Sequence, residues 1–247
     1  MSAQQLLEGV WLVGSGTHPH ALTDPHDCHS YLVWDGTGGF VVDCGTGLGS
    51  DTWLANIGSV CDPARVGGVL LTHYHADHAG GSAAATAAGL DVMAHPLAAK
   101  ALLAGDQAAT QLNRAKAAGI YPSDYTLAPA NVEPLPPGRR LRSGGIEVDV
   151  VDAPGHCDGH LVFLWDGPEG RTLFSGDCVF AGGRISMQAI PDCRLDLYAS
   201  TLIDLAFRDI DILLPGHQTL VLEGAAAQLK QAAASFSRLI PPPNVLT

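Results

Sequence analysis

The stretch Thr72-His73-Tyr74-His75-Ala76-Asp77-His78 holds four possible metal ligands within six residues. The apolar segment 69–72 predicts a short buried strand, so His73 stands at the end of that strand. Neutral imidazoles and an ionised carboxylate must lose water together at such a position. This is unfavourable unless a divalent cation compensates for it. The alternative interpretation is a polar loop of mutually hydrogen-bonded histidines.

Three more candidate ligands, His156, Asp177 and His217, each follow a strand-like segment. The tripeptide Pro-Gly-His occurs at 154–156 and again at 215–217. Proline stops a strand and glycine allows an abrupt turn, so each histidine is presented from a rigid sheet edge. Either histidine alone would more often be an ordinary loop residue, and it is the ensemble that favours a metal site. Nitrogen and oxygen donors without cysteine suit Zn²⁺, with Fe or Mn as alternatives.

The hydrophobic patterning predicts an α/β protein in which two β-sheets pack together with helices outside. Strands are expected at 10–13, 31–34, 40–42, 69–72, 91–94, 146–150, 161–165, 172–174 and 212–214. Helices are expected at 51–60, 79–88, 97–103, 106–118, 195–205 and 222–239, with a proline-rich connector at 129–137. The pair Gly80-Gly81 suits tight packing at the start of the second helix.

The order HxHxDH, then a distant histidine, an aspartate and a final histidine, resembles the metallo-β-lactamase superfamily, in its glyoxalase II-like and lactonase-like branch. The resemblance covers nearly the whole chain. It implies an αββα four-layer sandwich with the site at the shared edge of its two sheets. We expect one domain over residues 1–247, with a helical insertion at about 97–125 that covers the site.

The resemblance also implies how the ligands divide between two zinc ions. One ion would take His73, His75 and His156. The other would take Asp77, His78 and His217, and Asp177 would bridge both. A metal-bound hydroxide would attack the substrate carbonyl, while Asp77 would orient it and pass its proton to the leaving group. Asp43 matches a family position that supports the ligands from behind, although a strand-ending turn residue is an equal interpretation.

The expected substrate is an ester, thioester or lactone of a small metabolite. Phe180 stands where related lactonases carry a tyrosine, and the stretch 176–183 resembles a Gly-Asp-x-x-Phe-x-Gly-Gly stretch of glyoxalase II-like enzymes. Their basic cluster for glutathione is not found, because Lys230 and Arg238 are the only cations after residue 217. Candidate substrate contacts are His29, Tyr121, Tyr125, Phe180, Arg184 and Arg194. Packing tyrosines and arginines paired with surface acids are the alternatives.

The composition of the chain limits the classes of partner that the protein is expected to bind. A net charge of −12 and a pI of about 5.1 disfavour nucleic acid, and no apolar run is long enough to span a membrane. The stretch 1–13 has no basic region followed by an apolar region, so no signal peptide is expected. Six cysteines without a CxxC pair favour reduced thiols, and a cytoplasmic location is expected. Cys157 and Cys178, each next to a proposed ligand, are expected to be buried and inert. A small-molecule substrate is expected, and a homodimer is common in similar proteins.

Three other functions stay open. The same ligands could hold one iron for a sulfur dioxygenase-like reaction or a di-iron centre. A phosphodiesterase or nuclease of the same fold would need a basic surface, which this chain lacks. A metal-stabilised binding protein without turnover would not need all seven ligands. The segment 15–30, with His18, His20, His26 and His29, is expected to form a mobile rim loop, with a third metal site or a substrate lid as alternatives.

Overall fold

The computed structural model of the protein describes residues 2–17 and 19–245. Contacts along the chain divide it into two compact units. Unit 1 comprises Met1–Pro136 with Arg142–Ile146, and unit 2 comprises Pro137–Leu141 with Glu147–Thr247. The expectation of a single domain stays a prediction.

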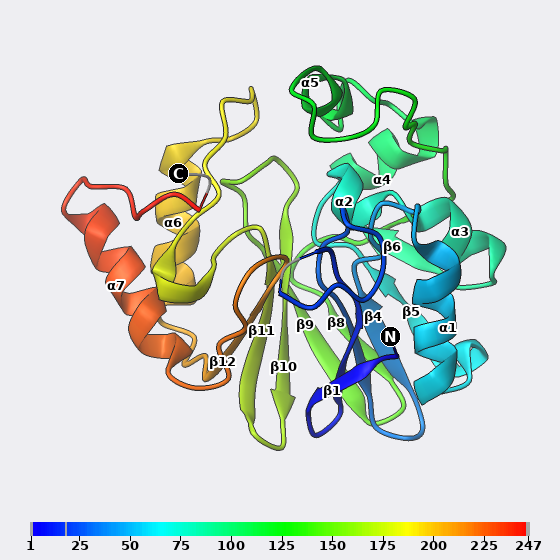
Figure 1. Ribbon diagram of the computed structural model, residues 1–247. Helices are drawn as coiled ribbons and strands as arrows, with labels where there is room; N and C mark the ends of the chain where they lie inside the picture. Colours follow the sequence, from blue (N-terminus) through cyan, green and yellow to red (C-terminus); the bar gives the residue numbers. More distant parts are fainter. Residues whose placement is uncertain (1, 18, 246–247) are drawn as a thin grey trace. The chain divides into compact units, whose positions relative to one another are not determined.

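Unit 1 is built on a seven-stranded mixed sheet in the order β1 to β7. Figure 1 labels β1, β4, β5 and β6 of this sheet. Its strands are β1 (Gln4–Leu7), β2 (Val10–Gly14), β3 (Ser30–Trp34), β4 (Gly39–Val42), β5 (Val66–Leu70), β6 (Val92–Ala94) and β7 (Glu133–Pro134). The first four strands pair antiparallel, and the pairs from β4 to β7 are parallel. Parallel neighbours need long crossovers, and helices supply them here.

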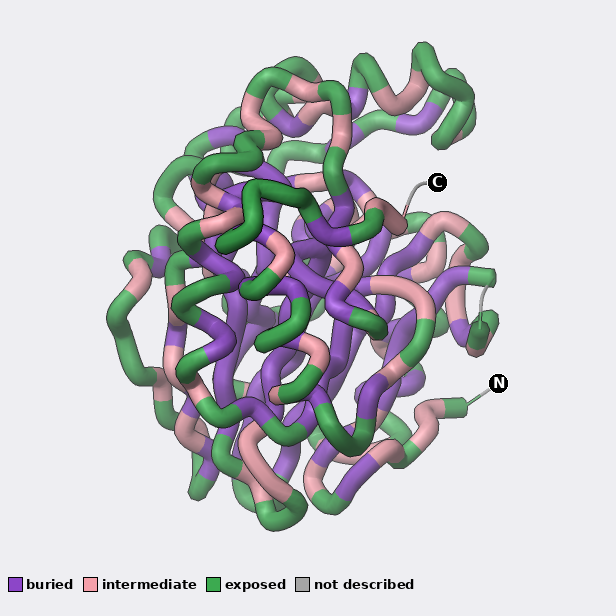
Figure 2. Tube along the Cα trace, turned by 90° about the vertical axis from the view of Figure 1, so that its left-hand side faces the viewer, coloured by how far each residue is buried: buried purple, intermediate pink, exposed green. Residues whose placement is uncertain are grey.

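The crossovers of unit 1 carry five α-helices within the described residues. They are α1 (Ser50–Val60), α2 (Ala76–Ala79), α3 (Ser82–Ala87), α4 (Pro96–Ala104) and α5 (Leu112–Ala117), with a 3₁₀ turn at Pro63–Arg65. Helix α1 packs against β2, while α3 and α4 pack against β6. Strands β3 and β4 are buried along their whole length, as expected for the centre of a covered sheet. Figure 2 marks the buried residues along the trace in purple.

Unit 2 contains a five-stranded sheet in the order β12-β11-β10-β9-β8. The strands are β8 (Arg140–Ser143), β9 (Ile146–Asp152), β10 (Leu161–Gly167), β11 (Gly170–Gly176) and β12 (Ile212–Pro215), and the β8–β9 turn is grouped with unit 1. Strand β11 pairs parallel with β12 and antiparallel with β10. Helices α6 (Leu195–Leu205) and α7 (Ala225–Ser237) pack against each other beside β12 (Figure 1), and a 3₁₀ turn covers Ala181–Gly183. One apolar core fills the space between these helices and the sheet.

Several boundary predictions are wrong for local reasons. The predicted helix 106–118 survives only as α5, because the Asp106 carboxylate accepts the amides of Ala108 and Ala109 in a turn, and Gln111 has a left-handed φ of 58°. The predicted helix 222–239 shortens to α7, and Leu239 is 93% exposed. The connector 129–137 includes β7, and strand 69–72 ends at Leu70.

The predicted helix 79–88 is also divided. It becomes α2 and α3, separated at Gly80-Gly81, where the chain passes close to the loop after β4. A Cβ atom on Gly80 would lie 2.3 Å from the Thr46 carbonyl oxygen, and one on Gly81 would lie 2.2 Å from that of Cys44. Only glycine fits such an approach. Among the described residues, no helix has the length and apolar character needed to cross a membrane.

Candidate metal centre

In unit 1, a single helical turn arranges the candidate ligands after β5. His75 is the residue before α2, and the amides of His78 and Ala79 donate to its carbonyl. Asp77 and His78 therefore lie within α2, while His73 lies in the turn between β5 and that helix. The ring centroids of His73 lie 4.6 Å from those of His75 and 4.2 Å from those of His78. The HxHxDH stretch thus gathers its side chains locally.

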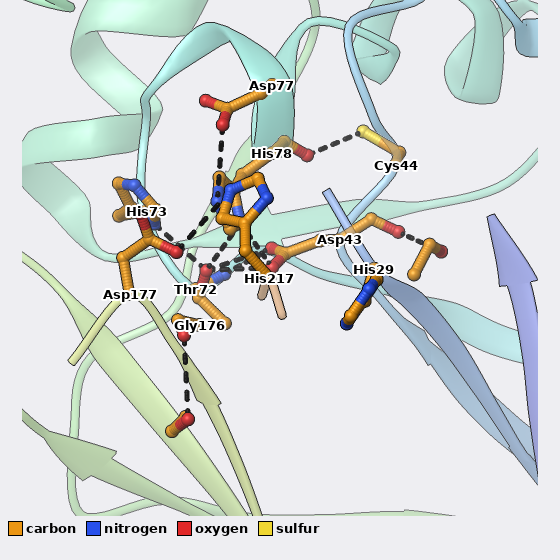
Figure 3. Close-up of polar contacts among 12 residues, drawn as sticks. His29, Asp43, Cys44, Thr72, His73, Asp77, His78, Gly176, Asp177 and His217 are labelled. Atoms are coloured by element: carbon orange, nitrogen blue, oxygen red, sulfur yellow. Dashed lines mark hydrogen bonds and ion pairs between the residues drawn. The ribbon is translucent and has the colours of Figure 1, made fainter. Parts of the chain in front are cut away.

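The Asp43 side chain makes hydrogen bonds to Thr72 and to the candidate ligand His78 (Figure 3). It follows β4 with a left-handed φ of 59° and is 1% exposed. Its Oδ1 accepts the Thr72 amide at 2.7 Å, its Oδ2 lies 2.8 Å from the Thr72 hydroxyl, and the same Oδ2 lies 2.8 Å from Nδ1 of His78. This buried carboxylate therefore connects the backbone and side chain of Thr72 to His78. This geometry gives Asp43 a supporting role.

The hydrogen bonds around Asp43 assign the protons on two imidazoles. Asp43 accepts only, so Nδ1 of His78 is the donor in their contact. The single hydroxyl proton of Thr72 also goes to Asp43, and the Thr72 oxygen then accepts from Nδ1 of His73 at 3.0 Å. Both neutral imidazoles therefore carry their lone pair on Nε2, which is the form that binds a metal. Asp77 Oδ2 lies 3.7 Å from Nε2 of His78.

Unit 2 presents its three candidates at the ends of three neighbouring strands. Asp177 follows β11 directly, His217 follows β12, and His156 follows β9 by four residues. The His156 Nδ1–H donates to the Ser186 carbonyl at 2.9 Å, which again leaves the lone pair on Nε2. Nε2 of His156 lies 3.7 Å from Oδ2 of Asp177, and Nε2 of His217 lies 3.7 Å from Oδ1. The two carboxylate oxygens therefore face different imidazoles.

The donor atoms in each of these pairs lie close to the spacing expected for two ligands of one metal ion. Two donors held at about 2.1 Å from one tetrahedral ion lie roughly 3.4 Å apart. The observed separation is 3.7 Å for Asp77 with His78 and for Asp177 with either histidine of unit 2. The donor atoms are imidazole nitrogens and carboxylate oxygens, which suit zinc, iron and manganese. The residues of each unit therefore fit divalent metal ions.

The chain matches a family model described as "Metallo-beta-lactamase superfamily" over residues 23–217. This match covers most of the sequence and includes all seven candidate ligands. The chain belongs to the metallo-β-lactamase superfamily. Its fold is accordingly the α/β fold of that superfamily, as predicted.

Similar proteins within the superfamily include enzymes. A hydroxyacylglutathione hydrolase of Halorhodospira halophila is 32% identical over 60% of this chain and 44% of its own length. A protein named thioesterase pkgB, of Emericella nidulans, is 27% identical over 78% of this chain and 46% of its own length. The chain thus spans less than half the length of these two relatives. The solved structure of the MIM-2 metallo-β-lactamase has a TM-score of 0.70 at 20% identity and covers 96% of this chain and 88% of its own, which shows the fold.

The expected substrate contacts of unit 1 have different surroundings. Tyr121, half-buried, interacts with the Asp77 carboxylate, and burial together with this contact raises the pKa of its hydroxyl well above the usual value. Tyr125 is buried, and its hydroxyl donates to the Thr46 carbonyl at 2.7 Å. His29 is 1% exposed and pairs through Nδ1 with the Tyr31 hydroxyl at 3.2 Å. Tyr121 is therefore the best placed of the three to meet a substrate.

The expected substrate contacts of unit 2 are engaged elsewhere. Arg194 forms an ion pair with Asp158 at 2.6 Å, which was the alternative interpretation for this residue. Arg184 donates to the carbonyl of Asn244 at 3.0 Å. Phe180 is 1% exposed. These arrangements do not favour substrate contacts by the three residues.

The cysteines and the histidine-rich segment 15–30 have defined surroundings within the described residues. All six cysteines are free thiols, and Cys157 and Cys178 are fully buried, as expected. Burial, reinforced by the Asp177 charge, raises the pKa of Cys178 to about 12, so it stays a thiol at neutral pH. In the segment 15–30, His26 pairs with Asp24 at 2.9 Å, the His20 ring lies 5.5 Å from that of His29, and His18 lies outside the described residues.

Sequence reasoning missed residues that contact the candidate ligands. Thr72 joins Asp43 to His73. Cys28 is buried, and its sulfur lies within 4.8 Å of donor atoms of Asp43 and His78. His160 is fully buried, with its ring 5.9 Å from that of His156. Only His160 left a signal in the sequence, namely the repeated Gly-His in 155–160.

Proposed function

We propose that this protein is a zinc-dependent hydrolase that cleaves an ester, thioester or lactone of a small metabolite. In this proposal, His73, His75 and His156 hold one ion, and Asp77, His78 and His217 hold the other, with Asp177 shared. The observation that carries the proposal is the arrangement of Asp177, whose two oxygens each face a different imidazole at 3.7 Å. A carboxylate that serves two ions needs this division.

The metal ions, when bound, would supply Lewis acidity and make water a stronger acid. The chain's own contribution is to fix the ligands before metal arrives. Asp43, Thr72 and the Ser186 carbonyl hold the Nδ1 protons of three imidazoles, so each offers Nε2 in one orientation. Preorganisation of this kind removes the reorganisation that binding and reaction would otherwise require.

Asp77 is the proposed acid–base residue. It is less buried than His73 and His78, with a side chain 18% exposed, so a substrate and water can approach it. Its carboxylate can orient an attacking water, accept its proton and deliver that proton to the leaving group. The Tyr121 hydroxyl, which interacts with Asp77, restricts the orientation of this carboxylate.

A thioester is the favoured substrate class among the three. One similar protein bears the name thioesterase and another hydroxyacylglutathione hydrolase. A glutathione thioester in particular is not favoured, because Arg184 and Arg194 already bind groups of the protein and the C-terminal region has few other cations. The net charge of −12 further supports a small molecule rather than nucleic acid, and the six free thiols support a cytoplasmic location.

A panel of substrates with matched metal analysis tests this proposal. Purified protein is assayed on acyl thioesters, lactones, aryl esters, phosphodiesters and β-lactams, while its metals and its oxygen consumption are measured. We expect zinc and the highest kcat/KM on a thioester, ester or lactone. Stoichiometric iron with oxygen uptake on a persulfide would instead establish the dioxygenase alternative, which the same nitrogen and oxygen donors permit.

A further inference from the structure

Helix α6 holds the loop that carries His156. The Arg194 amide at its start donates to the Gly155 carbonyl at 2.8 Å, and the Thr201 hydroxyl donates to the Pro154 carbonyl at 2.7 Å. Gly155, with a φ of 145°, lies so close that a Cβ there would be 2.7 Å from Cα of Tyr198. The Pro-Gly-His turn of unit 2 is therefore fixed by one face of α6.

Tyr198, in the middle of that face, makes hydrogen bonds that connect two candidate ligands, Asp177 and His156. It is fully buried, and its hydroxyl lies 2.8 Å from the backbone carbonyl of Asp177. The same hydroxyl lies 3.3 Å from the Ser186 amide and 3.4 Å from the Ser186 carbonyl. That carbonyl in turn accepts the Nδ1 proton of His156. One phenol oxygen thus touches the backbone of Asp177 and the residue that orients His156.

Proton counting gives each contact its direction. A phenol has one proton to donate, and the shortest contact, to the Asp177 carbonyl, takes it. The Tyr198 oxygen then accepts the Ser186 amide, which holds the peptide group of Ser186 in place. The Ser186 carbonyl is left to accept from His156.

We propose that Tyr198 is a positioning residue that fixes the mutual orientation of His156 and Asp177 for metal binding. This inference rests on the proposed function, since it concerns the same ligands. It assigns Tyr198 no contact with substrate. Its effect is on the affinity for the ion that His156 and Asp177 share, because outer hydrogen-bond partners of metal ligands typically alter affinity by about 10–100-fold.

The test is Tyr198→Phe, which keeps the ring and removes only the hydroxyl. Leu202→Val is the matched control, because Leu202 is fully buried one turn further along α6 and makes no hydrogen bond to the ligands. Stepwise zinc affinities are measured by competition with a chromophoric chelator, and the thermal midpoint of each metal-free protein is recorded. We expect Tyr198→Phe to weaken one zinc-binding step by about 10–100-fold, and Leu202→Val to change neither step by more than about threefold.

The outcomes separate this inference from the proposed function. Unchanged zinc affinities in Tyr198→Phe, with two ions bound by the wild type, would overturn the inference alone. Equal losses in both variants would also overturn it, since they would reflect packing. A wild-type protein that binds no stoichiometric metal would overturn the proposed function and this inference with it.

A second measurement needs no variant and covers the case in which Tyr198→Phe fails to fold. In the metal-free wild type, NMR should detect the Tyr198 hydroxyl proton and the His156 Nδ1 proton, both slow to exchange with water because both are buried donors. Rapid exchange of either proton would contradict the hydrogen bonds on which this inference depends.

Discussion

Replacing Asp77 with alanine is expected to lower kcat/KM by at least about 10³-fold while the protein stays folded. General acid–base catalysis by a positioned side chain contributes about 10²–10⁴-fold, and Asp77→Ala also removes a proposed ligand beside His78. The fold should survive because the Asp77 carbonyl, which accepts the Cys28 amide at 3.1 Å, belongs to the backbone and is unchanged by the substitution. Activity and the far-UV spectrum of the purified variant check both expectations.

The control for this variant is Asp91→Ala in the same unit. Asp91 is exposed and precedes β6, so its removal leaves the candidate ligands untouched. We expect Asp91→Ala to keep wild-type kcat/KM within about twofold. Near-normal kcat in Asp77→Ala would refute the role assigned to this carboxylate.

Replacing Asp177 with alanine is expected to reduce the metal content from two ions per chain to one or none. Asp177 is 7% exposed and faces His156 with one oxygen and His217 with the other, so its loss removes a donor from both proposed ions. A divalent ion contributes several kcal/mol to transition-state stabilisation, and about 4 kcal/mol corresponds to roughly 10³-fold. We therefore expect a loss of at least that size in kcat/KM.

Elemental analysis and kinetics of Asp177→Ala are compared with those of Asp152→Ala. Asp152 ends β9 in the same unit and is exposed. The variant Asp152→Ala should retain two metal ions per chain and full activity. Two tightly bound ions in Asp177→Ala would show that this carboxylate is not shared.

The positions of the candidate ligands along the strands could be predicted because the signals are local. Asp177 follows β11 and His217 follows β12, and the proline and glycine before His217 end the strand within the same few residues. The partners that orient the ligands could not be predicted in this way. Thr72 meets Asp43 across 29 positions and Tyr198 meets Asp177 across 21, so their pairing depends on the folded backbone.

The pairing of Arg194 with Asp158 and the loss of the predicted helix at 106–118 could not be predicted, because each depends on a side-chain contact that the sequence pattern does not show. Arg194 suggested an anion-binding site, yet its charge is paired with that of Asp158. Nothing in the sequence around either residue predicts this ion pair. Residues 106–118 have good helix propensity, but the Asp106 carboxylate accepts backbone amides that a helix would use. No helix therefore forms in this segment before α5. Propensity describes the average environment, whereas two local hydrogen bonds to the Asp106 carboxylate decide the conformation of this segment.

Removal of the metal followed by stepwise return of zinc tests whether activity depends on two ions held by the proposed ligands. The protein is stripped with a chelator, its metal content is verified as zero, and kcat/KM on its best substrate is followed as zinc is added back. The proposed ligand set predicts no activity without metal and recovery that levels off at two zinc ions per chain. Full activity in verified metal-free protein would contradict it.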